Sequence, residues 1–205
     1  MPEPDIPTTA SVYQLRVVLR EISPIIWRRL LVPADATLAD LHHVLQVAFS
    51  WSGEHLHRFV IHGAEFDAYD LAQVRLGDLE LRETERFVYD YDFTDFWRHD
   101  LRVEQVLAVE PGQRYPRCTG GRRAGPPEEC GGPWAFMELS QPHRVFDVIS
   151  RAAQIIGRLL DDMTQLGEHR EEMAALYPWL TLERFDRRAV NQVLAGLGDT
   201  ERSAA

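Results

Sequence analysis

The stretch Arg86-Phe87-Val88-Tyr89-Asp90-Tyr91-Asp92-Phe93 decides the fold, because its aromatic residues alternate with valine and aspartate. Successive side chains of a strand point to opposite faces of a sheet, so this alternation predicts a strand with one buried aromatic face. The same period of two runs through Val12–Arg20 and Ile26–Val32, on either side of Ser23-Pro24. We therefore expect these two segments to form an antiparallel hairpin.

One helix is predicted between this hairpin and the next strand. Thr37 and Asp40 have capping-box spacing, and apolar residues then recur at helical spacing through about Ser50. His55–His62 alternates again, which predicts a third strand. The order strand, strand, helix, strand is typical of a β-grasp-like core.

The C-terminal half is predicted to be mostly helical. Helical periodicity covers residues 145–163, with Gly167 as a stop, and a second helix over 168–176 is expected to break at Pro178. A last helix is predicted over 186–197. Residues 63–84, before these helices, show only weak patterning. One more strand is predicted over 101–109, and a long Gly/Pro/Arg-rich loop is predicted over 111–133.

These patterns predict an α+β fold with a mixed, largely antiparallel sheet, a β-grasp-like core and C-terminal helices. We expect a single domain over 12–197, whose C-terminal helical part covers about 144–197. A flexible lead-in would occupy 1–11 and a polar tail 198–205.

The composition excludes several kinds of chemistry. The 205 residues carry a net charge of -10, so bulk charge argues against nucleic acid and any such contact would be local. All 22 basic residues are arginine, which excludes a Schiff-base lysine and the P-loop lysine. No apolar run approaches the ~20 residues of a membrane span and no signal pattern begins the sequence, so a cytoplasmic protein with reduced cysteines is expected.

Common catalytic and cofactor motifs are absent. The sequence has no GxGxxG after a strand, no Walker loop, and no HExxH, GxSxG or CxxC. An RNA-binding sheet would expose aromatic residues among basic ones, whereas the aromatic strand here is interleaved with aspartates. The sequence therefore argues against the familiar nucleotide, hydrolase, redox and RNA-binding templates.

The densest group of functional side chains lies between Tyr89 and Asp100. Asp90 and Asp92 are expected on one strand face, about 7 Å apart. With Asp95 or His99 they could hold a hard divalent metal or supply an acid/base pair. A solvated acidic face over an aromatic core is the alternative interpretation.

A second group contains His55 and His57, next to Trp51. Two imidazoles at i and i+2 could share a metal, but the same strand face carries apolar residues, so packing is an equal alternative. His42 and His43 are expected to flank the buried stripe of the predicted helix.

A third group lies in the Gly/Pro/Arg-rich loop. Its arginines could close round an anion or neutralise the acidic strand; they are Arg114, Arg117, Arg122 and Arg123. Cys118 and Cys130 are separated by eleven residues, so a zinc site would need two further ligands, such as His99.

Several blocks in the same order resemble the plasmid pRiA4b ORF-3-like family, some of whose members are called TnpR-like passenger proteins of insertion elements. The resemblance covers about residues 12–195. The blocks are Val12-Tyr13-Gln14-Leu15, Ile26-Trp27-Arg28-Arg29, Thr37 to His42, His55-Leu56-His57, Tyr89 to Phe93 with Asp95, Trp97 and His99, Pro126 to Gly132, Phe185-Asp186 and Val190-Asn191.

This resemblance implies an α+β fold, an undetermined biochemical function and an association with plasmids and mobile elements. Thr94 stands where the family commonly has glycine. Gly125 stands where many members have a third cysteine, which weakens the case for zinc.

The leading hypothesis is a non-enzymatic binding or accessory module with an unknown protein or small-molecule partner. The candidate groove would be formed by Trp51, His55, His57, Asp90, Asp92, Asp95, Trp97, His99, Arg117, Arg122 and Arg123. It requires the Cys-bearing loop, the two imidazoles and the acidic segment to meet round one cavity.

Two alternatives remain open. One is a divalent-metal-dependent hydrolase or nuclease-like enzyme in which Asp90, Asp92, Asp95 and His99, with His55 or His57, activate water. The wider set of metal-ligand candidates is Asp92, Asp95, His99, Cys118 and Cys130. The other alternative is a DNA-contacting accessory factor that binds phosphates through Arg114, Arg117, Arg122 and Arg123.

Overall fold

The structure, a computed structural model, describes residues 11–202, apart from the side chains of 142, 143, 165 and 198–202. Of the predicted lead-in only Ser11 is described, and it begins the first strand. Strands β1 (Ser11–Leu19) and β2 (Trp27–Pro33) pair antiparallel, so the predicted hairpin is confirmed.

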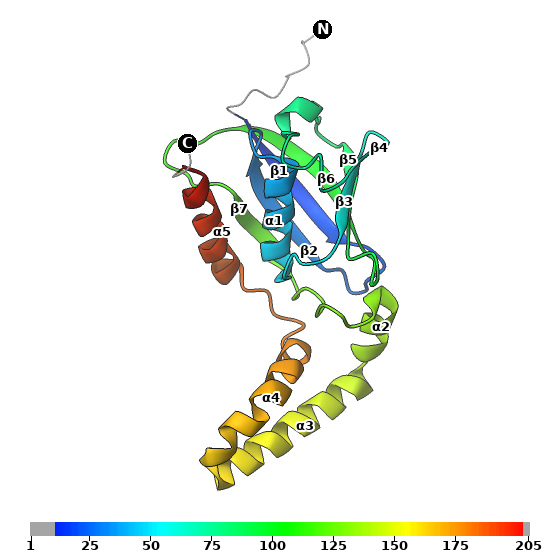
Figure 1. The fold of residues 1–205 in the computed structure, drawn as a ribbon, viewed down its shortest axis with the longest axis vertical. Helices are drawn as coiled ribbons and strands as arrows, with labels where there is room; N and C mark the ends of the chain where they lie inside the picture. The colour runs from blue at the N-terminus through cyan, green and yellow to red at the C-terminus, as the bar shows by residue number, and fades with distance from the viewer. Residues whose placement is uncertain (1–10, 203–205) are drawn as a thin grey trace.

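A seven-stranded sheet forms the centre of the molecule (Figure 1). Its strand order is β4-β3-β5-β6-β1-β2-β7, and every neighbouring pair is antiparallel. The remaining strands are β3 (His57–Ile61), β4 (Ala64–Phe66), β5 (Arg86–Tyr91), β6 (Trp97–Ala108) and β7 (Arg117–Arg122). The predicted α+β class with a largely antiparallel sheet is confirmed, and the β-grasp-like comparison stays a prediction.

Helix α1 (Leu38–Phe49) covers one face of this sheet. The Thr37 hydroxyl accepts from the Asp40 amide at 3.1 Å and the Asp40 carboxylate accepts from the Thr37 amide at 2.7 Å, which confirms the capping box. Ser50 ends the helix in the left-handed conformation. The apolar face of α1 packs on the sheet's inner face, whose core includes Leu15 and Tyr89.

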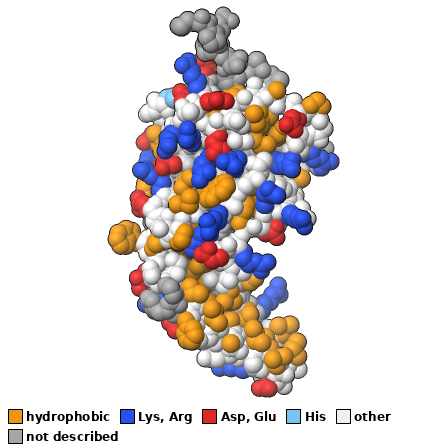
Figure 2. All heavy atoms as spheres, turned by 180° about the vertical axis from the view of Figure 1, so that it is seen from behind, with side chains coloured by type: hydrophobic (Ala, Val, Ile, Leu, Met, Phe, Trp, Pro, Cys, Tyr) orange, Lys and Arg blue, Asp and Glu red, His pale blue; other side chains and the backbone are white. Residues whose placement is uncertain are grey.

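The other face of the sheet, the open face, is covered by no helix in the part of the chain that the structure describes. Figure 2 shows this side, where arginine and acidic side chains are interspersed with apolar ones. Such a mixture of charged and apolar side chains is expected on the solvated face of an antiparallel sheet whose other face is packed.

The C-terminal helices extend the molecule and then return to it (Figure 1). Helices α3 (Pro142–Asp161) and α4 (Leu166–Leu180) form a hairpin that projects from the sheet, preceded by α2 (Gly132–Leu139). Helix α5 (Arg187–Arg202) lies beside β7 and α1. Short 3-10 turns occupy Gly77–Leu79 and Met163–Gln165.

Several predicted boundaries were wrong. The predicted loop over 111–133 contains β7, and the strand expected to begin at 101 begins at Trp97. Gly167 and Pro178 both lie inside α4, where Pro178 falls in the last turn and interrupts little of the helix. Helix α5 continues to Arg202 through much of the predicted tail, and residues 203–205 lie outside the described part.

No helix within residues 11–202 combines the length and the apolar character that a membrane span requires.

Candidate functional site

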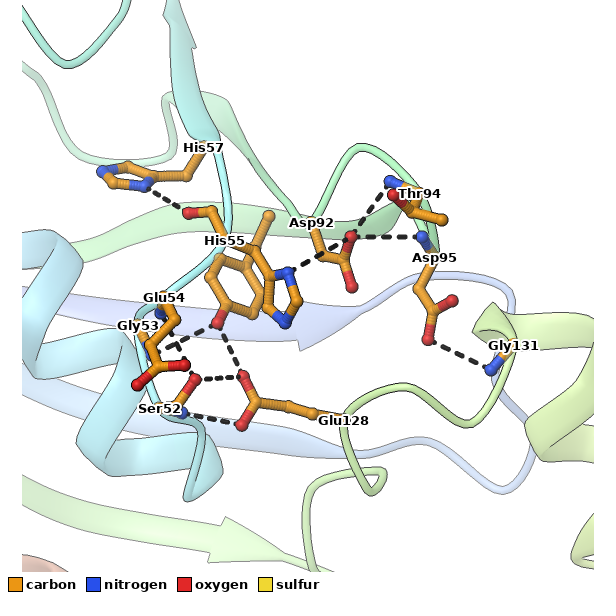
Figure 3. Close-up of polar contacts among 11 residues, drawn as sticks. Ser52, Gly53, Glu54, His55, His57, Asp92, Thr94, Asp95, Glu128 and Gly131 are labelled. Atoms are coloured by element: carbon orange, nitrogen blue, oxygen red, sulfur yellow. Dashed lines mark hydrogen bonds and ion pairs between the residues drawn. The ribbon is translucent and has the colours of Figure 1, made fainter.

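The inner face carries a buried cluster of aromatic and imidazole rings between α1 and β5. The Tyr89 hydroxyl lies 2.7 Å from Nδ1 of His42 and accepts a hydrogen bond of 2.8 Å from Nε2 of Gln46. The His42 ring stacks on His57, with ring centroids 3.6 Å apart. The His57 ring therefore stacks on a histidine of α1, and its contact with His55 is to the backbone carbonyl, 3.1 Å from Nδ1 (Figure 3). His42 follows Leu38 and Leu41 on the same helical stripe, which is the sequence signal for its burial.

Burial keeps these imidazoles neutral. It lowers the pKa of His42 to about 3, and it also lowers the pKa of His57. The pKa of the fully buried His99 falls to about 3 for the same reason. His99 Nδ1 lies 3.3 Å from the Tyr89 carbonyl, and its Nε2 has no hydrogen-bond partner among the described residues. His42 and His99 pack as core side chains, as does the predicted site residue Trp97, whereas His57 is half-buried.

Asp90 is held between two arginines on the open face. Its carboxylate accepts from Nε and Nη2 of Arg98, at 2.7 and 3.0 Å, and from Nε of Arg58 at 3.0 Å. Burial alone would raise the pKa of Asp90, but these charged hydrogen bonds hold it below its usual value. Asp90 therefore has a structural role, in which it joins Arg58 and Arg98 through ion pairs.

Asp92 lies beyond the end of β5, and the expectation that it shares a strand face with Asp90 is wrong. The backbone turns at Asp92, where φ is 55°. Its Oδ1 accepts from the amides of Thr94 and Asp95, at 3.0 and 3.3 Å, and lies 3.8 Å from Nδ1 of His55 (Figure 3). The two aspartates thus have different partners and cannot act as the predicted pair.

The loop 126–131 closes over this end of the sheet. Glu128 Oε1 accepts from the Tyr91 hydroxyl at 2.6 Å, and both carboxylate oxygens accept from Ser52. Trp51 Nε1 donates to the Pro126 carbonyl at 2.8 Å. The Asp95 carboxylate accepts from the amide of Gly131, at 3.1 Å (Figure 3). Hydrogen bonds therefore fasten this loop to Trp51 and to the acidic segment, and a common cavity that also includes the two imidazoles stays a prediction.

The two thiols lie in different surroundings. Cys118 is buried on β7, with Sγ 3.3 Å from the Gly120 carbonyl, and burial raises its pKa. Burial, followed by the charge of Asp95, raises the pKa of Cys130 to about 11. Within the described residues, no three His, Cys, Asp or Glu side chains are arranged to hold a metal. The structure does not assemble the candidate ligands Asp92, Asp95, His99, Cys118 and Cys130 into one set.

The four loop arginines are also separated. Arg123 is buried, donates to the Pro24 carbonyl at 2.7 Å and pairs with Glu183 at 2.8 Å, so it is unavailable to phosphate. Arg114 and Arg117 line a hollow of about 350 Å³ beside α5. Arg122 lies opposite Trp27 in the pairing of β2 and β7. The predicted basic island is therefore not one surface, and Arg117, Arg122 and Arg123 do not share a groove with His55.

A row of four arginines crosses the open face instead. Arg86 of β5 lies directly opposite Arg102 of β6, Arg102 opposite Arg16 of β1, and Arg16 opposite Arg29 of β2. Neighbouring strands are about 4.8 Å apart, so this arginine row spans four adjacent strands in register. The sequence alone does not reveal this row, because register between distant strands brings these residues together.

Two of the four arginines in the row have no acidic partner among the described residues. Arg29 pairs with Glu104, whose Oε1 accepts from Nη2 at 3.0 Å. The charge of Arg16 also acts on Glu104, whereas Arg86 and Arg102 form no ion pair with any described residue. Like charges placed directly opposite one another destabilise a sheet, so the arginine row is a surface that an anion would stabilise.

An aromatic side chain lies beside the arginine row. The guanidinium carbons of Arg16 and Arg29 are 4.6 and 5.6 Å from the ring centroid of Trp27, which is partly exposed. The aromatic strand β5 is interleaved with aspartates as expected, and the combination of an aromatic ring with basic residues occurs on β1 and β2 instead.

One family model matches this chain, and two similar proteins of uncharacterized function were found. Residues 11–145 match the family described as plasmid pRiA4b ORF-3-like protein. The uncharacterized protein y4hQ of Sinorhizobium fredii (strain NBRC 101917 / NGR234) is 32% identical over 143 residues, which are 64% of this chain and 73% of that protein. The crystal structure of the protein of unknown function MM3350 from Methanosarcina mazei Go1 matches with a TM-score of 0.65 and 30% identity, over 89% of this chain and 97% of that one.

Proposed function

We propose that this chain, which belongs to the plasmid pRiA4b ORF-3-like family, is a non-enzymatic binding module that holds single-stranded nucleic acid on the open face of its sheet. The observation that carries the proposal is the in-register arginine row Arg86–Arg102–Arg16–Arg29, two members of which, Arg86 and Arg102, lack an acidic partner among the described residues.

The arginine row suits a phosphate backbone. A guanidinium is permanently charged and its planar fork matches phosphate oxygens. The side chains stand on a broad sheet rather than on a helix that could enter a groove, which favours a flexible single strand over a duplex. Net charge opposes binding elsewhere on the molecule, so it would confine a bound strand to this face.

Trp27 would supply a stacking platform. Base stacking on an aromatic ring contributes about 1–3 kcal/mol per base and tolerates any sequence. Arg16 and Arg29 already lie over the Trp27 ring, so a base that stacks there would displace a guanidinium, which could then pair with a neighbouring phosphate.

The side chains nominated for catalysis have structural partners, which supports a binding role over an enzymatic one. Asp90 is held by Arg58 and Arg98, and Asp92 accepts from turn amides. An accessory role on single strands would suit a protein of mobile elements, the setting that the resemblance to TnpR-like passenger proteins implies.

Fluorescence anisotropy with a labelled oligothymidylate tests the proposal. We expect binding that weakens as salt rises, because each phosphate contact releases counterions. In the double variant Arg86→Ala/Arg102→Ala, the slope of log K against log salt should fall by about 1.4, since each lost contact contributes about 0.7 for a single strand.

The double variant Arg158→Ala/Arg170→Ala is the matched control, because it removes two exposed arginines of the α3–α4 hairpin and changes the net charge equally. It should bind as the unaltered protein does. Equal losses in both double variants, or tighter binding of a duplex than of the single strand, would contradict the proposal.

A further inference from the structure

Arg28 is a buried cation without an acidic partner. It lies on β2 facing α1, and only 1% of the residue is exposed. Its Nε donates to the Ala48 carbonyl at 2.7 Å, and its Nη1 donates to the carbonyls of Trp27 and Arg122 at 2.9 and 3.1 Å. No described carboxylate pairs with it. The Nη2 amino group takes part in none of these three bonds.

Two aromatic rings flank the guanidinium. Its central carbon lies 4.0 Å from the ring centroid of Phe185 and 4.8 Å from that of Phe49. Carbonyl oxygens and ring faces carry only partial negative charge, so they lower the cost of burying this cation without neutralising it. A buried charge of this kind is normally paired.

Arg28 lines a pocket of about 310 Å³. The walls come from the C-terminal end of α1, the segment 124–125, the connection between α4 and α5, and α5 itself, and they include Val47, Phe185, Val190 and Val193. Arg184 adds a second cation. The acidic residue of the lining, Asp186, already caps α5, because its Oδ1 accepts from the amides of Arg188 and Ala189 at 3.0 Å.

We propose that this pocket binds a small organic carboxylate, whose anionic group contacts Arg28 and whose compact apolar part lies against Phe185 and Val190. The cation at an apolar-walled pocket of this size matches the pattern of a small-ligand site, in which one charged group orients an otherwise apolar ligand. Burial lowers the pKa of Arg28 to about 10, which leaves it charged at neutral pH. The pocket lies on the helix side of the sheet and is independent of the proposed nucleic-acid face.

Calorimetric titration of the full chain with benzoate and isobutyrate, at constant ionic strength, tests this site. We expect saturable binding of both. Inorganic phosphate should bind more weakly, because it lacks the apolar part that the walls accept. The matching neutral amide, benzamide, should bind at least about tenfold more weakly than benzoate, since a charge-assisted hydrogen bond is lost.

Three variants distinguish an effect on the pocket from an effect on the fold. Ala189→Phe fills the pocket from α5 without touching the Arg28 hydrogen bonds and should abolish carboxylate binding. Gln192→Phe adds the same ring to an exposed position of α5 outside the lining, and should bind normally. Arg28→Lys keeps the charge but loses the planar fork, so its binding should weaken by about tenfold or more if it folds.

Carboxylate binding that is unchanged in Ala189→Phe would overturn the proposal. So would binding of benzamide as tight as that of benzoate, or the absence of any heat with both carboxylates. None of these outcomes depends on whether the open face binds an oligonucleotide.

Discussion

His99 lies where the inner face is most densely packed, and its ring contacts Phe49, Trp51 and Tyr89. Because burial lowers its folded pKa to about 3, the unfolded chain takes up a proton first as the pH falls below the usual histidine value near 6.5. The free energy of unfolding contributed by neutral His99 is therefore present at pH 7 and is lost progressively between about pH 6.5 and pH 3.

This predicts a pH dependence that one substitution reduces. When the pH falls from 7 to 5, the free energy of unfolding should decrease by about 2 kcal/mol because of His99, and His99→Phe should remove that decrease. Urea unfolding at both pH values measures it. Val103→Ala, a non-titrating core variant of the same strand, should keep the original pH dependence. An equal pH dependence in His99→Phe and the unaltered chain would show that this imidazole is not responsible.

For single residues, the sequence predicted which side chains are buried better than it predicted which side chains they contact. Alternation over Arg86–Tyr91 correctly placed Tyr89 and Tyr91 in the core. It could not show that Asp90 would meet Arg58 from β3 and Arg98 from β6, because those contacts depend on register between strands. For the same reason it could not find the arginine row, whose members come from four strands.

At the element scale, β7 shows how tertiary contacts create a strand from a poor sequence. Arg117-Cys118-Thr119-Gly120-Gly121-Arg122 contains two glycines, which disfavour strands, and it was predicted as loop. Its outer edge is occupied by α5: the Cys118 amide donates to Asn191 Oδ1 at 2.8 Å, and Asn191 Nδ2 donates to the Cys118 carbonyl at 2.9 Å. By contrast, local signals sufficed for α1, whose capping box needs only Thr37 and Asp40.

Asn191→Ala should therefore loosen this edge of the sheet. Both backbone groups of Cys118 lose their partners, so we expect a cost of about 1–3 kcal/mol and faster hydrogen exchange at the Cys118 amide. Mass-spectrometric hydrogen exchange measures the second effect. Gln192→Ala, on the exposed side of the same helix, should leave exchange in β7 unchanged. Unchanged protection of Cys118 in Asn191→Ala would mean that α5 does not hold β7.

For the molecule as a whole, the distribution of charge over its surface is a better guide to anion binding than the net charge is. A net charge of -10 argued against nucleic acid, yet the open face places Arg86 and Arg102 without ion pairs among the described residues. Composition averages over both faces, so it could not reveal this local excess. Family membership and the α+β class were predicted correctly from the sequence, whereas the proposed binding face came only from the assembled sheet.

Photochemical crosslinking of a bound oligothymidylate, followed by mass-spectrometric mapping, tests the central claim most directly. We expect crosslinked peptides from β1 and β2, centred on Trp27, together with protection of Arg86 and Arg102 from arginine-modifying reagents. Crosslinks confined to Arg114, Arg117 and neighbouring residues of α5, with Trp27 unmodified, would contradict the proposal that the open face binds the strand.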